Sequence, residues 1–413
     1  MIQFDSFTLD NGLRVIVHED ASVQIAVMNI LYDVGSRDEN AARTGFAHLF
    51  EHLMFGGSAN IPSYDTPLQM AGGENNAFTN TDITNYYLTV PASNLETGFW
   101  LESDRMLSLS FNPSVLEVQR KVVIEEFKQR YFSQPYGDVW LKLRPLAYQV
   151  HPYQWATIGK EISHIEQATL EDVKDFFFTH YLPNNAILVV AGNVTLEEIK
   201  RLSEKWFGPI PSKVIERRNL PKEPKQVQKR TFSVQAKVPA NALYKAWHMV
   251  GRTHADYYAA DLSSDVLSRG QSSRFYQKLI KEKEIFTSIS SYVTGTIDPG
   301  LFVVSGRLKP GISMEQAERE VDMLLQEFTT HGPTVDELEK VKNQSESTMA
   351  FGNAEVINRA MNLAYSAWLG DANLVNTELE KIRSVTHEDI LRVASVMLTE
   401  ENASVLYYHA AEN

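Results

Sequence analysis

The stretch Gly45-Phe46-Ala47-His48-Leu49-Phe50-Glu51-His52-Leu53-Met54-Phe55-Gly56 decides how this chain is interpreted. It predicts a helix that ends at the glycines that follow it. Residues three and four apart share one helix face, so His48, Glu51 and His52 converge on one point. Two neutral imidazoles at this spacing suit a tetrahedral zinc ion, and the carboxylate beside them suits a general base for zinc-bound water. The order H-x-x-E-H is the inverse of the better-known H-E-x-x-H.

A simpler interpretation of this stretch is an ordinary helix, because most helical histidines lie at the surface or in a core where they are hydrogen-bonded. The flanking residues argue against it. Phe46, Leu49, Phe50, Leu53 and Met54 make the helix apolar nearly all round, which predicts burial. Burying two imidazoles and a carboxylate without partners is costly. We therefore interpret the stretch as a metal site.

A catalytic zinc ion needs a third protein ligand, and the two histidines leave it one short. The chain has no cysteine, so this ligand must be a histidine or a carboxylate. A long helix is predicted from about Val115 to Arg130, and it carries two adjacent glutamates after three aliphatic residues. Such a pair usually marks the start of a solvent-exposed face. Here either Glu125 or Glu126 could reach the metal.

Composition limits the class of protein. The chain has 413 residues, of which 43% are hydrophobic and 22% charged, which is typical of a soluble globular protein with two domains. The net charge of -13 disfavours nucleic acid and anionic membrane surfaces as partners. No apolar run is long enough to cross a membrane, and the first residues do not resemble a signal peptide. We expect a soluble, unsecreted protein.

The order of elements predicts an α+β fold in which a mostly antiparallel sheet is covered by helices in each of two domains. Strand and helix patterns alternate irregularly, beginning with a hairpin around Asn11-Gly12. Four prolines interleaved with lysine and arginine predict a linker at 209–230. The predicted domains are therefore a zinc-binding catalytic domain at 1–208 and a related non-catalytic domain at 231–413.

An internal repeat supports this duplication. The segment from Thr169 to Val190 matches the segment from Thr386 to Tyr407, with a constant spacing of 217 residues and no gaps. Each copy reads as a capped helix followed by a strand at the end of its half. The second-half segment that should correspond to the metal helix, about 256–268, has no histidine pair. The first half therefore carries the predicted metal site, and the second half has the same predicted fold without it.

These features together resemble the pitrilysin/insulinase family of zinc peptidases over essentially the whole chain. The branch that fits is the short two-domain one, which includes the mitochondrial processing peptidases and their bacterial relatives. The resemblance implies one zinc ion per chain, with His48 and His52 as ligands and Glu51 as the general base. The third ligand of the family ends an Arg-x-Val-aliphatic-aliphatic-x-Glu stretch, and Arg120 to Glu126 matches it. This match selects Glu126 over Glu125.

The resemblance also implies how substrate would be held. The family uses an edge strand after the metal helix to bind an extended peptide, and Asn76, Ala77, Phe78 and Thr79 occupy that place. The family often has a glutamate seven residues before the third ligand, and here that position is Gln119. An amide can still orient a histidine or a water molecule by a hydrogen bond, but it adds no charge.

A second departure lies in the C-terminal half. The family places an arginine and a tyrosine, seven residues apart, against the substrate carbonyl, and the corresponding positions here are Ile280 and Thr287. Either the alignment of this half with the family is off by one helical turn, so that Lys281 or Lys283 acts with Tyr292, or another chain supplies the arginine and the tyrosine. The second explanation is preferred. It implies a homodimer or a heterodimer with a related zinc-free subunit.

We therefore expect a zinc-dependent metalloendopeptidase that hydrolyses oligopeptides or unfolded segments in a closed chamber, with no nucleic acid or membrane partner. Because no signal peptide is predicted, we expect a soluble protein of the bacterial cytoplasm, or a periplasmic one if a signal peptide has been removed. Three alternatives stay open. The chain could be the zinc-bearing subunit of a heterodimer that is inactive alone, a non-catalytic structural subunit, or a zinc hydrolase that acts on a non-peptide substrate.

Overall fold

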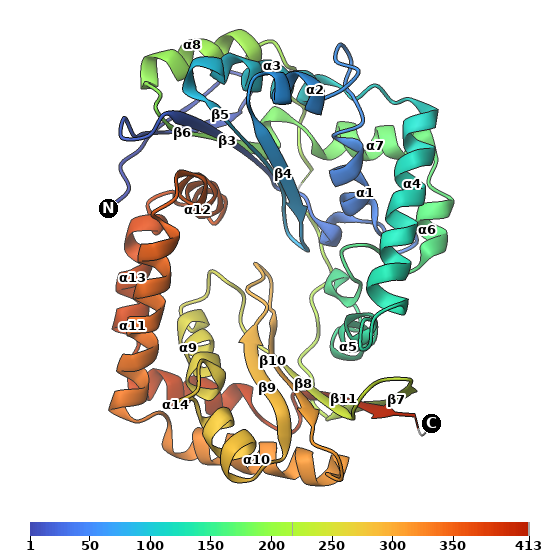
Figure 1. Ribbon diagram of the computed structural model, residues 1–413, viewed down its shortest axis with the longest axis vertical. Helices are drawn as coiled ribbons and strands as arrows, with labels where there is room; N and C mark the ends of the chain where they lie inside the picture. The colour runs from blue at the N-terminus through green and yellow to red at the C-terminus, as the bar shows by residue number, and fades with distance from the viewer. Residues whose placement is uncertain (217, 412–413) are drawn as a thin grey trace. The chain divides into compact units, whose positions relative to one another are not determined.

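The computed structural model describes residues 1–216 and 218–411, and they form two compact units. Unit 1 contains residues 1–128, 155–220 and 350–377. Unit 2 contains residues 129–154, 221–349 and 378–413. Each unit is built around one β-sheet, and the α+β class expected from the sequence is confirmed (Figure 1). None of the described helices is both long and apolar enough to cross a membrane.

Unit 1 contains a six-stranded sheet with the order β1-β2-β6-β3-β5-β4. All neighbouring strands are antiparallel except β2 and β6, which run parallel. The hairpin predicted around Asn11-Gly12 joins β1 to β2. The strands are β1 (Asp5–Thr8), β2 (Arg14–Glu19), β3 (Ile25–Tyr32), β4 (Glu74–Thr79), β5 (Thr84–Pro91) and β6 (Ala186–Gly192).

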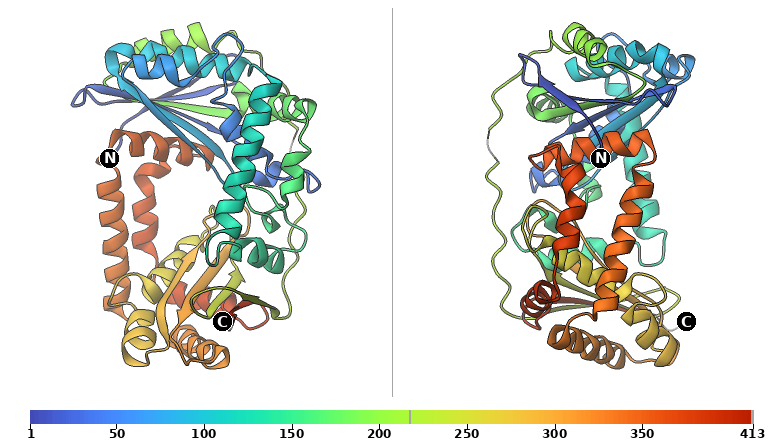
Figure 2. Two further views of the ribbon diagram at one scale, coloured as in Figure 1. Left: turned by 45° about the vertical axis from the view of Figure 1, so that its right-hand side comes forward. Right: turned by 90° about the vertical axis from the view of Figure 1, so that its left-hand side faces the viewer.

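Helices cover both faces of this sheet. Seven of them pack around one face and its margin, and α12 (Val356–Trp368) packs on the other (Figure 2). The buried side chains alternate along β3 accordingly: Val27 and Leu31 contact the α12 layer, whereas Met28 and Ile30 point to the opposite face. The seven helices are α1 (Phe46–Leu53), α2 (Asp65–Met70), α3 (Leu95–Leu107), α4 (Pro113–Phe127), α6 (Ile162–Glu166), α7 (Leu170–His180) and α8 (Leu196–Trp206).

Unit 2 contains a five-stranded sheet with the order β7-β11-β8-β10-β9, in which only β7 and β11 run parallel. Its strands are β7 (Arg230–Ala236), β8 (Ala242–His248), β9 (Phe286–Val293), β10 (Leu301–Leu308) and β11 (Ala403–Ala410). Its helices include α5 (Val139–Ala147), α9 (Tyr257–Ser268), α10 (Met314–His331) and α14 (His387–Met397). Helices α11 (Val335–Gly352) and α13 (Leu374–Ser384) each continue from one unit into the other.

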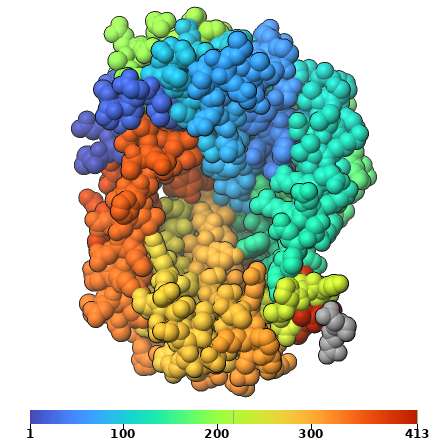
Figure 3. Space-filling view, viewed as in Figure 1, coloured from blue at the N-terminus to red at the C-terminus, as the bar shows by residue number. Residues whose placement is uncertain are grey.

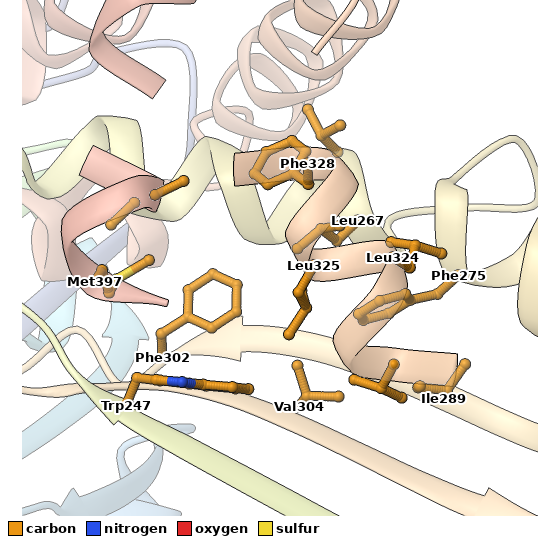
Figure 4. Close-up of a cluster of buried hydrophobic side chains, with 14 of the residues drawn as sticks. Trp247, Leu267, Phe275, Ile289, Phe302, Val304, Leu324, Leu325, Phe328 and Met397 are labelled. Atoms are coloured by element: carbon orange, nitrogen blue, oxygen red, sulfur yellow. The ribbon is translucent and has the colours of Figure 1, made fainter. Parts of the chain in front are cut away.

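One face of the second sheet carries the main hydrophobic core of unit 2. Trp247, Phe302 and Val304 point from the strands towards Leu325 and Phe328 on α10 (Figure 4). The opposite face carries a smaller core, in which α5 packs on residues such as Ala246 and Leu406. The sheet is therefore covered on both faces around its centre.

The structure confirms the repeat. Helix α14 begins 217 residues after α7, and β11 begins 217 residues after β6. Both helices start with the same capping box, in which the threonine hydroxyl accepts from the third helical N–H and the aspartate accepts from the threonine N–H. Helix α9 occupies the segment expected to correspond to the metal helix and carries no histidine.

The compact units do not follow the contiguous ranges 1–208 and 231–413. Residues 129–154, including α5, belong to unit 2, and residues 350–377, including α12, belong to unit 1. Each sheet therefore receives a helix from the other half of the sequence. The division of the sequence into a catalytic domain, a linker and a non-catalytic domain stays a prediction about the duplicated halves.

Candidate metal centre

Helix α1 presents the two histidines of the H-x-x-E-H stretch on one face. His48 is 8% exposed and His52 is half-buried, and their ring centroids lie 4.9 Å apart with the planes at 73°. Phe50, on the opposite side of the helix, packs against Phe176 and Tyr181 with ring centroids 5.0 and 5.2 Å away. This aromatic packing fixes the rotation of α1 and directs the imidazoles away from the core.

The start of α1 is held by a residue that the sequence did not reveal. Glu39, which is 7% exposed, accepts hydrogen bonds from the backbone N–H groups of Gly45 at 2.9 Å and Ala47 at 2.8 Å. Glu39 thus takes the place of a capping side chain, because the N-cap residue Gly45 has no side chain that could accept these hydrogen bonds. Gly45 has φ +90, and a Cβ there would lie 2.5 Å from the Ile158 carbonyl oxygen. Only glycine fits this position without rearrangement.

Helix α4 brings Glu126 to the two histidines. One of its carboxylate oxygens lies 3.6 Å from His48 Nε2 and 3.5 Å from His52 Nε2. Glu125 points to solvent and pairs with Lys128 at 2.6 Å. Asn112 caps the start of the helix, and the Arg120 guanidinium donates to the Ala168 carbonyl at 2.6 Å. The structure thus brings Glu126, and not Glu125, to the histidine pair.

The three side chains fit a zinc ion. With metal–ligand distances near 2.0–2.2 Å, tetrahedral ligands stand about 3.3–3.6 Å from one another. The two nitrogen–oxygen distances match this range, and all three ligand atoms lie within 4.8 Å of one another. Two imidazoles and one carboxylate are a donor set that suits catalytic zinc, which keeps a fourth position open.

Glu51 lies on α1 beside this group, and its carboxyl is more than half buried. Burial raises the pKa of Glu51, while Thr79 on β4 and the nearby His52 oppose the shift. A carboxylate with a raised pKa accepts a proton more readily at neutral pH. The structure therefore places a candidate base next to the candidate metal ligands.

The predicted substrate strand is the edge strand β4, which pairs only with β5 in the described sheet. Asn76 and Phe78 are exposed, whereas Ala77 and Thr79 are partly buried on the α1 side. Gln119 is partly buried on α4, two helical turns before Glu126. The roles of these residues stay predictions.

In unit 2, Ile280 packs against the hydrophobic core and the Thr287 hydroxyl donates to the Arg307 carbonyl at 3.1 Å. Of the alternative residues, Lys283 pairs with Glu320, and the Tyr292 ring packs against Trp140 at 6.5 Å between centroids. The charge of Lys283 is thus already partnered within its own unit, and the alternative through Lys281 stays a prediction.

The fold and the three convergent side chains define a two-unit α+β protein with a His-His-Glu group that can hold a metal ion. Residues 14–158 match the family described as insulinase (peptidase family M16), and residues 167–345 match the peptidase M16 inactive domain. The chain therefore belongs to the M16 peptidase family.

Individual relatives agree with this assignment. The chain is 31% identical over 350 residues to zinc protease PqqE of Helicobacter pylori, which covers 82% of this chain and 77% of that protein. It is 24% identical to the uncharacterized zinc protease YmxG of Bacillus subtilis, with 97% of each chain covered. The crystal structure of a protease from Helicobacter pylori superposes with a TM-score of 0.94 at 27% identity, covering 99% of this chain and 100% of that one.

Proposed function

We propose that this protein is a zinc-dependent endopeptidase that hydrolyses oligopeptides or unfolded segments. The observation that supports it is the convergence of His48, His52 and Glu126, with the partly buried Glu51 carboxyl beside the two histidines on α1. The two imidazoles and the Glu126 carboxylate would hold one zinc ion. When bound, zinc supplies Lewis acidity: it polarises the scissile carbonyl and lowers the pKa of a water molecule.

Glu51 performs the proton transfers in this proposal. Its carboxylate takes a proton from the attacking water and returns it to the nitrogen of the leaving amine. Partial burial favours this role, because a carboxyl with a raised pKa holds the proton long enough to pass it on. Strand β4 would bind the peptide in extended form through its free edge, so that recognition depends little on the peptide sequence.

The test uses the purified full chain and a mixed library of quenched peptides. We expect cleavage that a chelator abolishes and added zinc restores. The Glu51→Gln variant should bind zinc as tightly as the unsubstituted protein, and its rate should fall by about 10²–10⁴, the range that general acid–base catalysis contributes. Cleavage by Glu51→Gln at the unsubstituted rate would refute the proposed role of Glu51.

A second candidate is the zinc-bearing subunit of a heterodimer, and one observation favours it. The positions at which the family resemblance implies an arginine and a tyrosine hold Ile280, which packs against the core, and Thr287. Neither offers a charged or phenolic donor to a developing oxyanion. If the chain alone binds zinc but cleaves no peptide, and gains activity when a related zinc-free subunit is added, this second function replaces the first. A zinc-free chain without activity would instead be a structural subunit.

A further inference from the structure

A polar pocket lies within unit 2, remote in sequence from the candidate metal centre. It has a volume of about 260 Å³ and lies on the sheet face that also carries α5. Tyr244, Ser288, Ser290, Ser305 and Arg307 supply its polar lining. Helix α5 packs on β7, β8 and β11 and shares a core with Leu301 and Val303 of β10, whereas the pocket lies towards the other end of β9 and β10, at residues 288–290 and 305–307. Atoms of the yellow-to-orange segment that contains these strands are visible at the surface of unit 2 (Figure 3).

Arg307 provides the positive charge of this pocket. Its side chain is exposed, and no acidic side chain in the described ranges lies within ion-pair distance of it. Most other arginines of unit 2 are paired, for example Arg252 with Glu378 and Arg274 with Glu337. An arginine without a partner, in a chain with a net charge of -13, can accept an anionic ligand at no cost to an existing ion pair.

The Arg307 guanidinium is held in place by Tyr136. It lies over the Tyr136 ring, 4.9 Å from the centroid. The Tyr136 hydroxyl donates to the Ala240 carbonyl at 2.7 Å and accepts from the Ala240 N–H at 3.1 Å. The backbone of Tyr136 has φ +63, a left-handed conformation that residues other than glycine rarely adopt. The backbone is thus kept in an unfavourable conformation that supports the ring beneath Arg307.

Hydroxyl groups complete the pocket. The Ser290 and Ser305 hydroxyls lie 3.4 Å apart on paired strands, and Tyr244 follows on the next strand. Burial raises the pKa of Tyr244 to about 12, so its phenol stays protonated and can donate. A planar guanidinium with hydroxyl donors around it is the combination that binds a carboxylate.

We propose that this pocket binds the carboxylate of a glutamate or aspartate side chain within an extended peptide, and so gives the protein a preference for acidic peptides. The peptide nature of the ligand rests on the proposed function. The pocket itself does not, because none of its residues belongs to the candidate metal centre. The carboxylate meets the Arg307 guanidinium as a hydrogen-bonded ion pair, and the serine and tyrosine hydroxyls donate to its remaining lone pairs.

The test measures peptide binding by the full-length Glu51→Gln variant, in which cleavage is suppressed. Two acetylated and amidated ten-residue peptides differ only in a central glutamate or glutamine, and isothermal titration gives their dissociation constants. We expect the glutamate peptide to bind about tenfold more tightly, the gain typical of a hydrogen bond to a charged group. Adding Arg307→Ala should abolish this difference, and Arg307→Lys should retain part of it.

A matched control is Arg319→Ala, which removes an exposed arginine on α10 that has no ion pair in the described part of the chain. It should leave the preference unchanged, and thermal melting should show that both arginine variants are folded. Equal binding of the two peptides, or an equal loss in Arg319→Ala, would overturn the inference. A glutamine peptide with a free C-terminus that binds as tightly as the glutamate peptide would overturn the assignment to a side chain. Peptide binding through Arg307 without any cleavage by the unsubstituted chain would refute the proposed function alone.

Discussion

The Glu126 carboxylate lies 3.5 Å from His52 Nε2, although the two residues are 74 positions apart and stand on different helices. Glu125, the neighbour of Glu126, turns outward and pairs with Lys128. The chain therefore contains its own matched pair of acidic residues, one within the candidate metal centre and one outside it.

The first prediction concerns this pair. Glu126→Gln removes the charge of a proposed ligand, so zinc affinity should fall by more than about 100-fold, since even the loss of a hydrogen-bond partner of a ligand typically costs about 10–100-fold. Glu125→Gln changes the same charge one residue away and should leave affinity within about twofold. Competition with a zinc-sensitive dye measures both. Equal losses in the two variants would show that general charge, and not ligation, governs zinc binding.

The second prediction concerns Glu39. Burial raises the pKa of Glu39 to about 8, against an ordinary value near 4.5. The folded protein therefore retains a proton that the unfolded chain releases between these two values, so the contribution of Glu39 to the free energy of unfolding decreases as pH rises from about 4.5 to about 8. Glu39→Gln cannot titrate, and this part of the pH dependence should disappear.

Urea denaturation of both proteins at pH 5.5, 6.5, 7.5 and 8.5 gives the comparison. Glutamine has one acceptor oxygen where Glu39 uses two, so the variant should be less stable at acidic pH by about 1–3 kcal/mol, the cost of one unsatisfied buried N–H. The difference in the free energy of unfolding between the unsubstituted protein and Glu39→Gln should shrink as pH rises. A difference that grows with pH would mean that the helix N–H groups hold Glu39 ionised.

Sequence reasoning was most successful where the signal is local. The spacing of His48, Glu51 and His52 depends only on the 3.6-residue helical repeat, and the capped helices at Thr169 and Thr386 depend on contacts within four residues. Glu126 required the resemblance to a known family, because nothing in the helix pattern alone separates it from Glu125.

The elements that sequence reasoning missed depend on distant contacts. Glu39 lies in a loop six residues before Gly45, and its two hydrogen bonds go to backbone groups, which leave no side-chain pattern to recognise. The apolar faces of α5 and α12 predict burial but cannot show against which sheet, because the hydrophobic effect has no direction. Tyr136 could not be expected in a left-handed conformation for the same reason: tertiary contacts with Ala240 and Arg307 hold it there.

The third prediction concerns the glycine at the start of the metal helix. Gly45→Ala would place a Cβ 2.5 Å from the Ile158 carbonyl oxygen at a positive φ, so α1 should shift and stability should fall by about 2 kcal/mol or more. Gly352→Ala is the control, since no atom lies within 4 Å of its added Cβ and its φ is not positive. It should be neutral or slightly stabilising. Thermal melting and zinc affinity together should separate the two variants, and equal effects would argue against a tight fit at Gly45.

The fourth prediction tests the assignment of α12 to the first sheet. Leu363 is fully buried on α12 and packs in one cluster with Val27 and Ile187 from β3 and β6. Leu363→Ala removes three buried carbon atoms and should lower the stability of unit 1 by about 2–5 kcal/mol. Val396→Ala, at a 75% exposed position on α14, should change stability by less than about 0.5 kcal/mol.

Hydrogen exchange read by mass spectrometry locates this effect in the chain. In Leu363→Ala, peptides that cover β3 and β6 should exchange faster, because the helix that covers them packs less well. Peptides that cover β8 and β10 should keep their protection, since their core contains no residue of α12. If β8 and β10 lost protection while β3 and β6 retained it, α12 would belong to the sheet of its own half of the sequence, and the exchange of helices between the two halves would be wrong.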